Sequence, residues 1–332
     1  MRLQQSFDPI GPQVHSLTMD NGRQVYYIDE GEPGWKPMVF LGGQGTSLQA
    51  FQLNEMYRST REQLHVRTIS VERNGFGESP YDPSLGYEDY VDEVLAVLRH
   101  LHVNRFAIEA VSGGGAYAAH LAARVPHRVR SLHLASVSPL TLVGTPRPAS
   151  CSLTMKERNA SNIAYTHNPK VWWAEPDDAP VKLIPGWQDE AYLDAARSFF
   201  VNGQLGDPSP LSHEGQLPCL PGAAADLSEV HAPAYLYWGD SDSSVPISTM
   251  ALWAKALPNV VAERVYPGEG HTVQYRHGDQ ILVDAAGLGR YTVLCSHGRS
   301  VLLAGRKAAR AQRAGATLGI CAWQPATAWG RG

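Results

Sequence analysis

The 332-residue sequence has no large excess of charge, no long apolar run and no closely spaced pair of cysteines. Its 28 basic and 32 acidic residues leave a formal net charge of -4, which provides no general attraction to nucleic acid or to an anionic membrane. No stretch approaches the roughly 18 apolar residues of a spanning helix, and the N-terminal MRLQQSFDPIGPQ lacks the apolar centre of a secretory signal. We therefore expect a cytoplasmic protein that acts on a small molecule, without nucleic acid or membrane as a partner.

The four cysteines, Cys151, Cys219, Cys295 and Cys321, are far apart in the sequence. Their spacing indicates neither a zinc site nor a dense disulfide framework. We expect free thiols in a reducing compartment, and neither a metal nor a cofactor. The sequence gives no indication of the oligomeric state.

What the sequence does contain is an alternation of buried strands and amphipathic helices. Strands are expected at 37–41, 66–71, 105–111, 129–135, 234–238 and 261–266, and helices at 87–100, 114–125 and 247–257. Before them, Asn21-Gly22 favours a two-residue hairpin turn between short strands at 17–19 and 23–28. Strands that alternate with helices predict an α/β fold with a doubly wound, mainly parallel sheet.

One long segment interrupts this alternation. Residues 138–232 are rich in proline and aromatic side chains. A structureless loop of that length is uncommon in a compact domain, so we expect an inserted helical cap. The α/β core would then consist of residues 1–137 and 233–286.

The C-terminal extension, 287–332, holds seven basic residues and no acidic one. Short strands are expected at 291–295, 300–303 and 317–323, and an alanine-rich helix at 307–314. Together these elements would form a small appended module. Its cations could dock on the acidic remainder of the chain, on a partner or on nucleic acid, but a solvated basic helix is the simplest interpretation.

The glycine-rich stretch after the strand at 105–111 permits two readings. Gly113 to Ala118 match the dinucleotide fingerprint G-x-G-x-x-G/A, but no acidic residue stands between Glu109 and Glu157 to hold a ribose. Alternatively, AVSGG at 110–114 is a variant of G-x-S-x-G, a sharp turn that exposes Ser112 above the carboxyl ends of the strands. The ordinary structural explanation is that Ser112 only caps the following helix. Ser112 is a candidate nucleophile only if a base and an acid follow it in the right order.

A carboxylate and an imidazole do follow in the order that such a serine requires. Asp240 and Asp242 come just after the strand at 234–238, and His271 comes just after the strand at 261–266. A hydroxyl becomes a good nucleophile when an imidazole removes its proton, and a carboxylate on the other ring nitrogen fixes the tautomer. The pattern favours nucleophilic catalysis over phosphate binding.

From about Gln24 to Gly287 the chain resembles the α/β-hydrolase fold family, in its serine esterase-like branch. The elbow around Ser112 is joined by three motifs in the family's order: ERNGFGESP at 72–80, GDSDSSVP at 239–246 and GH at 270–271. The resemblance implies Ser112 as nucleophile, His271 as base and Asp242, rather than Asp240, as acid. The chain departs from the family pattern at Ala110 in the elbow and at Glu72 and Asn74 in the turn.

The family usually has His-Gly after its third strand, whereas this chain has Gly42-Gly43-Gln44-Gly45. We expect the backbone N–H groups of Gln44 and Gly113 to form the oxyanion hole, because backbone amides need no particular side chain. Aromatic side chains of the cap favour an apolar pocket. The pocket candidates are Trp172, Trp173 and Trp187.

The activity implied by the resemblance is hydrolysis of a small to medium carboxylic ester through an acyl-enzyme. One alternative is an aminopeptidase similar to the proline iminopeptidases, in which cap acids bind the amino group of the substrate. Acids available for that role are Glu175, Asp177, Asp178, Asp189 and Glu190. A second alternative is a ligand-binding protein of the same fold with little or no turnover. Related C–C bond hydrolases and perhydrolases use the same triad.

Overall fold

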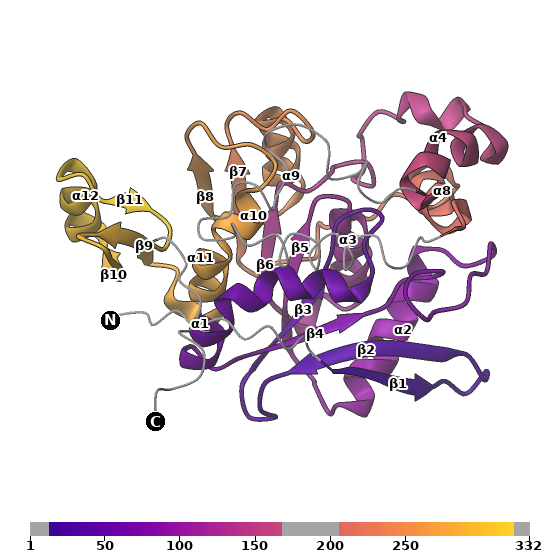
Figure 1. Ribbon diagram of the computed structural model, residues 1–332, viewed down its shortest axis with the longest axis horizontal. Helices are drawn as coiled ribbons and strands as arrows, with labels where there is room; N and C mark the ends of the chain where they lie inside the picture. Colours follow the sequence, from indigo (N-terminus) through magenta and orange to yellow (C-terminus); the bar gives the residue numbers. More distant parts are fainter. Residues whose placement is uncertain (1–12, 168–205, 322–332) are drawn as a thin grey trace.

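The computed structural model describes residues 13–167 and 206–321 (Figure 1). Its centre is an eight-stranded sheet in the order β1-β2-β4-β3-β5-β6-β7-β8. The strands are β1 (Val14–Thr18), β2 (Gln24–Glu30), β3 (Lys36–Leu41), β4 (Val66–Val71), β5 (Phe106–Val111), β6 (Val129–Ala135), β7 (Ala234–Gly239) and β8 (Val260–Tyr266). β2 is antiparallel to both of its neighbours and the other neighbouring strands are parallel, which confirms the predicted mainly parallel sheet.

Helices cover both faces of the sheet. One face packs on α2 (Tyr87–His100), α3 (Gly114–Arg124) and α9 (Met250–Ala256), and the other on η1 (Leu48–Tyr57), α10 (Val273–Arg276) and α11 (Gly278–Val283). The alternation of β3 shows how a strand serves both layers: Val39 and Leu41 join the first core, and Phe40 joins the second. α1 (Arg58–Gln63) packs against α11.

The hairpin of β1 and β2 forms as expected, but the prediction of a two-residue turn is wrong. Thr18 pairs with Gln24, and Met19 N donates a hydrogen bond to Arg23 O across a wider loop. Within that loop only Gly22 has a positive φ, 84°. The Asn21 side chain instead accepts a hydrogen bond from Arg23 N at 3.0 Å, which favours the wider turn over the two left-handed residues that the tighter one requires.

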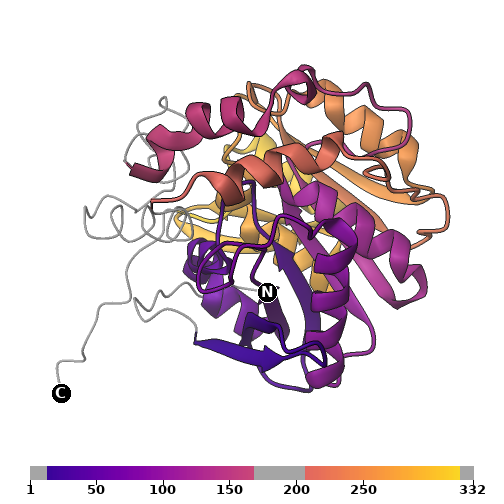
Figure 2. The same cartoon turned by 90° about the vertical axis from the view of Figure 1, so that its right-hand side faces the viewer.

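In its described part, the predicted insertion between β6 and β7 contains α4 (Met155–His167) and α8 (Ser209–Gln216), which pack against each other. Both lie above the sheet, as Figure 2 shows from a second side. The short 3₁₀ helix η3 (Ala149–Ser152) precedes α4, and η5 (Leu217–Cys219) follows α8. The predicted helix at 247–257 is divided into η6 (Ile247–Thr249) and α9. The division of the chain into core, cap and extension stays a prediction.

The expectation of free thiols is wrong, because the four cysteines form two disulfides. Cys151 pairs with Cys219 across 68 residues, and Cys295 pairs with Cys321 across 26. Sequence spacing could not reveal this, since folding brings the α-carbons of each pair to 5.3 and 4.7 Å. Disulfides persist in oxidising compartments, so the cytoplasmic location, which stays a prediction, loses the support of the thiol argument. In the described ranges, none of the helices has the length and apolar character needed to cross a membrane.

The C-terminal residues form a second sheet at the end of the molecule opposite to α4 and α8 (Figure 1). Its strands, in the order β10-β9-β11, are β9 (Tyr291–Ser296), β10 (Arg299–Ala304) and β11 (Thr317–Leu318), and α12 (Gly305–Arg313) lies between the last two in sequence. The third strand is shorter than expected. Gln280 of α11 attaches this sheet to the core, because its side chain donates to Tyr291 O at 3.0 Å and accepts from Val293 N at 2.8 Å.

Candidate active site

Ser112 occupies the sharp turn between β5 and α3 that the sequence predicts. Its φ is 49°, in the left-handed region that costs energy for a residue other than glycine. Two amides hold this conformation, since Gly115 N and Ser138 N both donate to Ser112 O, at 3.2 and 2.9 Å. A methyl group on Gly114 would lie 2.3 Å from Leu41 O, which explains why the turn needs a residue without a side chain at that position.

The structure brings Ser112, His271 and Asp242 into one chain of hydrogen bonds. Ser112 Oγ lies 3.0 Å from His271 Nε2, and His271 Nδ1 lies 2.9 Å from Asp242 Oδ2. Asp242 follows β7 and His271 follows β8, so the three side chains meet from the ends of three parallel strands. Asp240 faces elsewhere, because its Oδ1 accepts a hydrogen bond from Gly268 N at 2.7 Å. The aspartate that contacts the imidazole is therefore the one that the resemblance implied.

The environment of Asp242 favours its ionised form. Its side chain is fully buried, and Oδ1 accepts hydrogen bonds from Ser244 N and Val245 N at 2.9 and 2.8 Å. Burial alone would raise the pKa of Asp242, but the hydrogen bond and charge of His271, together with the Val245 amide, outweigh it and lower the pKa. A carboxylate in this position holds a proton on Nδ1 of His271 and leaves Nε2 free to accept one from Ser112.

The loop after β3 lies beside Ser112. The Gln44 backbone packs directly against Gly113, so that a methyl group on Gly113 would be 2.8 Å from Gln44 N. A methyl group on Gly43 would be 3.9 Å from Ser112 Oγ. The two residues expected to supply oxyanion donors, Gln44 and Gly113, are therefore neighbours next to the serine.

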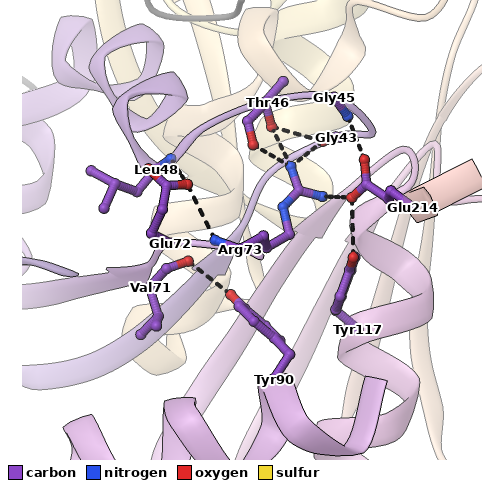
Figure 3. A network of polar contacts seen from close by, with 10 residues as sticks. All are labelled: Gly43, Gly45, Thr46, Leu48, Val71, Glu72, Arg73, Tyr90, Tyr117 and Glu214. Carbon is purple, nitrogen blue, oxygen red and sulfur yellow. Dashed lines mark hydrogen bonds and ion pairs between the residues drawn. The ribbon is translucent and has the colours of Figure 1, made fainter. Parts of the chain in front are cut away.

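A buried ion pair anchors this loop to α8 (Figure 3). The guanidinium of Arg73, which follows β4, pairs with Glu214 of α8, and the two residues are only 5% and 6% exposed. Glu214 Oε2 also accepts a hydrogen bond from Gly45 N at 2.7 Å, and Tyr117 OH donates to Oε1 at 3.2 Å. Arg73 Nη2 donates to Gly43 O at 2.6 Å, to Thr46 Oγ1 at 2.9 Å and to Thr46 O.

The hydrogen bond to Gly43 O has a consequence for the neighbouring amide. The carbonyl of Gly43 and the N–H of Gln44 belong to one planar peptide unit and point in opposite directions. By holding the carbonyl, Arg73 also fixes the direction of the Gln44 N–H.

Sequence reasoning missed the roles of Arg73 and Glu214. Asn74 stands where the turn motif of the resembled family has arginine, and it bonds to the backbone of Asp82, while Arg73 supplies the buried guanidinium. Glu72 is also buried, which raises its pKa to about 7, and its Oε1 accepts a hydrogen bond from Leu48 N at 2.9 Å. An arginine beside a glycine-rich turn was a usable signal, whereas no motif in α8 distinguishes Glu214.

A cavity of about 240 Å³ lies between the Gln44 loop and the two helices α4 and α8. Polar side chains contribute much of its described lining, and the expected apolar pocket stays a prediction. They include Gln44, Tyr87, Tyr117, Ser138, Ser150, Arg158, Ser161, Asn162, Ser212 and Glu214. The predicted pocket residues Trp172, Trp173 and Trp187 lie outside the described residues, as do the acids proposed to bind an amino group. No group of side chains suited to a metal ion occurs in the ranges that the structure describes.

Residues 38–285 match the sequence model of the alpha/beta hydrolase family. A putative non-heme chloroperoxidase of Synechocystis is 24% identical over 288 residues, which cover 81% of this chain and 94% of that protein. A 2-hydroxy-6-oxo-2,4-heptadienoate hydrolase of Pseudomonas putida is 32% identical over 129 residues, 38% of this chain and 45% of that protein. Among solved structures, a thermophilic esterase from Thermogutta terrifontis aligns with a TM-score of 0.61 and 16% identity, over 84% of this chain and 98% of that one.

Proposed function

The chain belongs to the alpha/beta hydrolase family, and we propose that it is a serine hydrolase that cleaves a small to medium carboxylic ester through an acyl-enzyme. The observation that carries this proposal is the continuous chain of hydrogen bonds from Ser112 through His271 to the buried Asp242. A serine in a strained turn, bonded to an imidazole whose other nitrogen meets an ionised carboxylate, is arranged for nucleophilic attack.

In the first step, Ser112 Oγ attacks the carbonyl carbon of the ester while His271 Nε2 takes the hydroxyl proton. The carbonyl oxygen becomes negatively charged and accepts hydrogen bonds from the amides of Gln44 and Gly113, which need no reorganisation as the charge develops. Asp242 stabilises the imidazolium that forms. The tetrahedral species collapses when His271 donates its proton to the leaving alcohol, and Ser112 remains esterified.

In the second step, His271 removes a proton from a water molecule, which attacks the acyl-enzyme. The same two amides stabilise the second oxyanion, and the proton then returns through His271 to Ser112 Oγ as the carboxylic acid leaves. No metal or cofactor takes part in this sequence of steps. The products are one acid and one alcohol for each water consumed.

A steady-state comparison of wild type with Ser112→Ala tests the proposal on a panel of p-nitrophenyl esters. We expect kcat to fall by roughly 10⁴ to 10⁶, by analogy with other triads in which the nucleophile is removed. A prolyl anilide in the same panel separates an esterase from an iminopeptidase. If Ser112→Ala kept the turnover of the wild type, the proposed nucleophile would be wrong, and if only the anilide were cleaved, the substrate class would be wrong.

The aminopeptidase alternative receives no support from the part of the cavity that is described. Glu214 is the single acidic residue in the described lining, and its carboxylate is already engaged by Arg73, Gly45 and Tyr117. A substrate ammonium group would have to compete with the Arg73 guanidinium for it. An ester without a positive charge does not compete with Arg73 for the Glu214 carboxylate.

A further inference from the structure

One cation in the cavity, Arg158, has no acidic partner in the part of the chain that the structure describes. Arg158 of α4 is only 6% exposed. Its guanidinium donates to Gly215 O at 3.0 Å and to Ser150 O, and it contacts Cys219 Sγ at 3.6 Å. Its buried Nε has no hydrogen-bond partner, and none of its contacts within 13–167 and 206–321 is a carboxylate. Among the described residues, only neutral groups hold this buried guanidinium in place.

The described charges around the cavity leave the positive charge of Arg158 uncompensated. Glu214, the acid in the described lining, forms its ion pair with Arg73. Arg158, Arg73 and Glu214 together sum to one positive charge. A buried charge without a counter-ion is costly, because protein dipoles replace its hydration only in part. An anion that entered the cavity would supply the missing partner.

The cavity is lined by Gly215, and two N–H donors lie close to this glycine. A methyl group placed on Gly215 would lie 3.7 Å from Arg158 Nη1 and 3.2 Å from Gln44 Nε2. Two N–H donors from different elements thus approach the space that a side chain at position 215 would fill. The same cavity is lined by Gly113 and by Gln44, the residues next to Ser112. A group bound there would be part of the molecule whose carbonyl reaches the serine.

We propose that this cavity binds a carboxylate of the substrate through Arg158, with the Gln44 side-chain amide as a second donor. The substrate would be an ester that carries a free carboxylate, such as the monoester of a dicarboxylic acid. Arginine suits this task because its guanidinium is always charged and carries five N–H donors, of which the contacts to Gly215 O, Ser150 O and Cys219 Sγ use three. The assignment of a substrate class rests on the proposed esterase function, although binding of the carboxylate does not.

The first test compares monoethyl adipate with ethyl hexanoate, two ethyl esters of equal acyl length that differ in the terminal carboxylate. A second pair, methyl 4-acetoxybenzoate and 4-acetoxybenzoate, carries the neutral or anionic group on the phenol that leaves from the acetate ester. We expect wild type to have the higher kcat/KM on the anionic member of at least one pair. In Arg158→Met, the anionic-to-neutral ratio of kcat/KM should fall about 10- to 100-fold, which is the usual loss for a charge-assisted hydrogen bond. Arg158→Lys should retain part of the ratio.

Arg310→Met is the matched control, because it removes an equal charge from the exposed face of α12, at the opposite end of the molecule. It should leave both rates and their ratio unchanged. Should Arg158→Met fail to fold, Gly215→Ala decides in its place, since the added methyl group fills the space between the two donors and should lower the same ratio.

A second test measures binding without turnover, as the rise in melting temperature that adipate causes in Ser112→Ala. We expect a rise in that protein and none once Arg158→Met is added. The proposal is overturned if wild type prefers the neutral esters, if the ratio is the same in all variants, or if adipate stabilises both proteins equally. If no ester is hydrolysed but adipate still binds through Arg158, the proposed function fails while the carboxylate site stands.

Discussion

Replacement of Arg73 by lysine is expected to slow the chemical step without a comparable loss of substrate binding. Lysine keeps the positive charge beside Glu214 but has a single nitrogen in place of the guanidinium fork. Arg73 contacts Glu214 through Nη1 and both Gly43 O and Thr46 O through Nη2, and one ammonium nitrogen cannot occupy both positions. The peptide that carries the Gln44 N–H then loses one of the hydrogen bonds that set its direction.

The size of the effect follows from what remains. Complete loss of one oxyanion donor costs about 10² to 10³ in kcat. In Arg73→Lys the Gln44 amide is still present, and Gly43 O still accepts a hydrogen bond from Thr46 Oγ1 at 2.7 Å. We therefore expect kcat to fall about 10- to 100-fold, with KM changed by less than about threefold, because the weakened hydrogen bond, from Gln44 N–H to the oxyanion, forms fully only in the transition state.

The assay is steady-state hydrolysis of a p-nitrophenyl ester, accompanied by thermal unfolding to verify that the variant is folded. Arg67→Lys is the matched control: Arg67 is 4% exposed and bonds to both oxygens of Asp29 at 2.6 Å, at the other end of β4. It should lower the melting temperature while leaving kcat close to wild type. The reasoning is refuted if Arg73→Lys keeps full kcat, or if both variants lose kcat equally.

Three further predictions concern stability. Alkylation of the native protein without a reductant should label no cysteine, and labelling of all four thiols before reduction would contradict this. Reduction of the Cys151–Cys219 bond, which closes a 68-residue loop, should lower the free energy of unfolding by up to about 4 kcal/mol. Burial raises the pKa of Glu109 to about 8, so its contribution to stability is present below its unfolded pKa and lost as pH rises to about 8. The free energy of unfolding of Glu109→Gln relative to wild type, measured by denaturation, should therefore be more favourable at pH 8 than at pH 5. A difference that does not change with pH would refute this. Truncation after Gly287 removes the buried side chains of Val293 and Leu294 and should lower the urea midpoint, whereas an unchanged midpoint would mean that the extension does not stabilise the core.

Much of the fold was predictable because its signals are local. The helix Tyr87–His100 has the expected bounds, since its apolar positions repeat at helical spacing and acids occupy its first turn. Ser112, Asp242 and His271 could be located because each follows a buried strand, and the carboxyl ends of parallel strands meet at one edge. The hairpin turn was misjudged because one side-chain hydrogen bond, from Arg23 N to Asn21, changed the preferred geometry.

The parts that sequence reasoning missed depend on contacts between distant residues. Arg73 and Glu214 are 141 positions apart, and nothing near Glu214 marks it as the partner of a buried guanidinium. Arg158 looks like any helix arginine until packing shows that it is buried. The pairing of four cysteines has three possible solutions, and only the folded chain selects one.

The central claim, that Ser112 is acylated during turnover, is tested most directly by intact-mass spectrometry after treatment with a fluorophosphonate probe. The account predicts one adduct per chain in the wild type, located by peptide mapping at Ser112, and none in Ser112→Ala. Rapid acid quenching during ester turnover should trap the acyl group at the same position. An adduct on another residue, or full ester hydrolysis by a protein that forms none at Ser112, would contradict it.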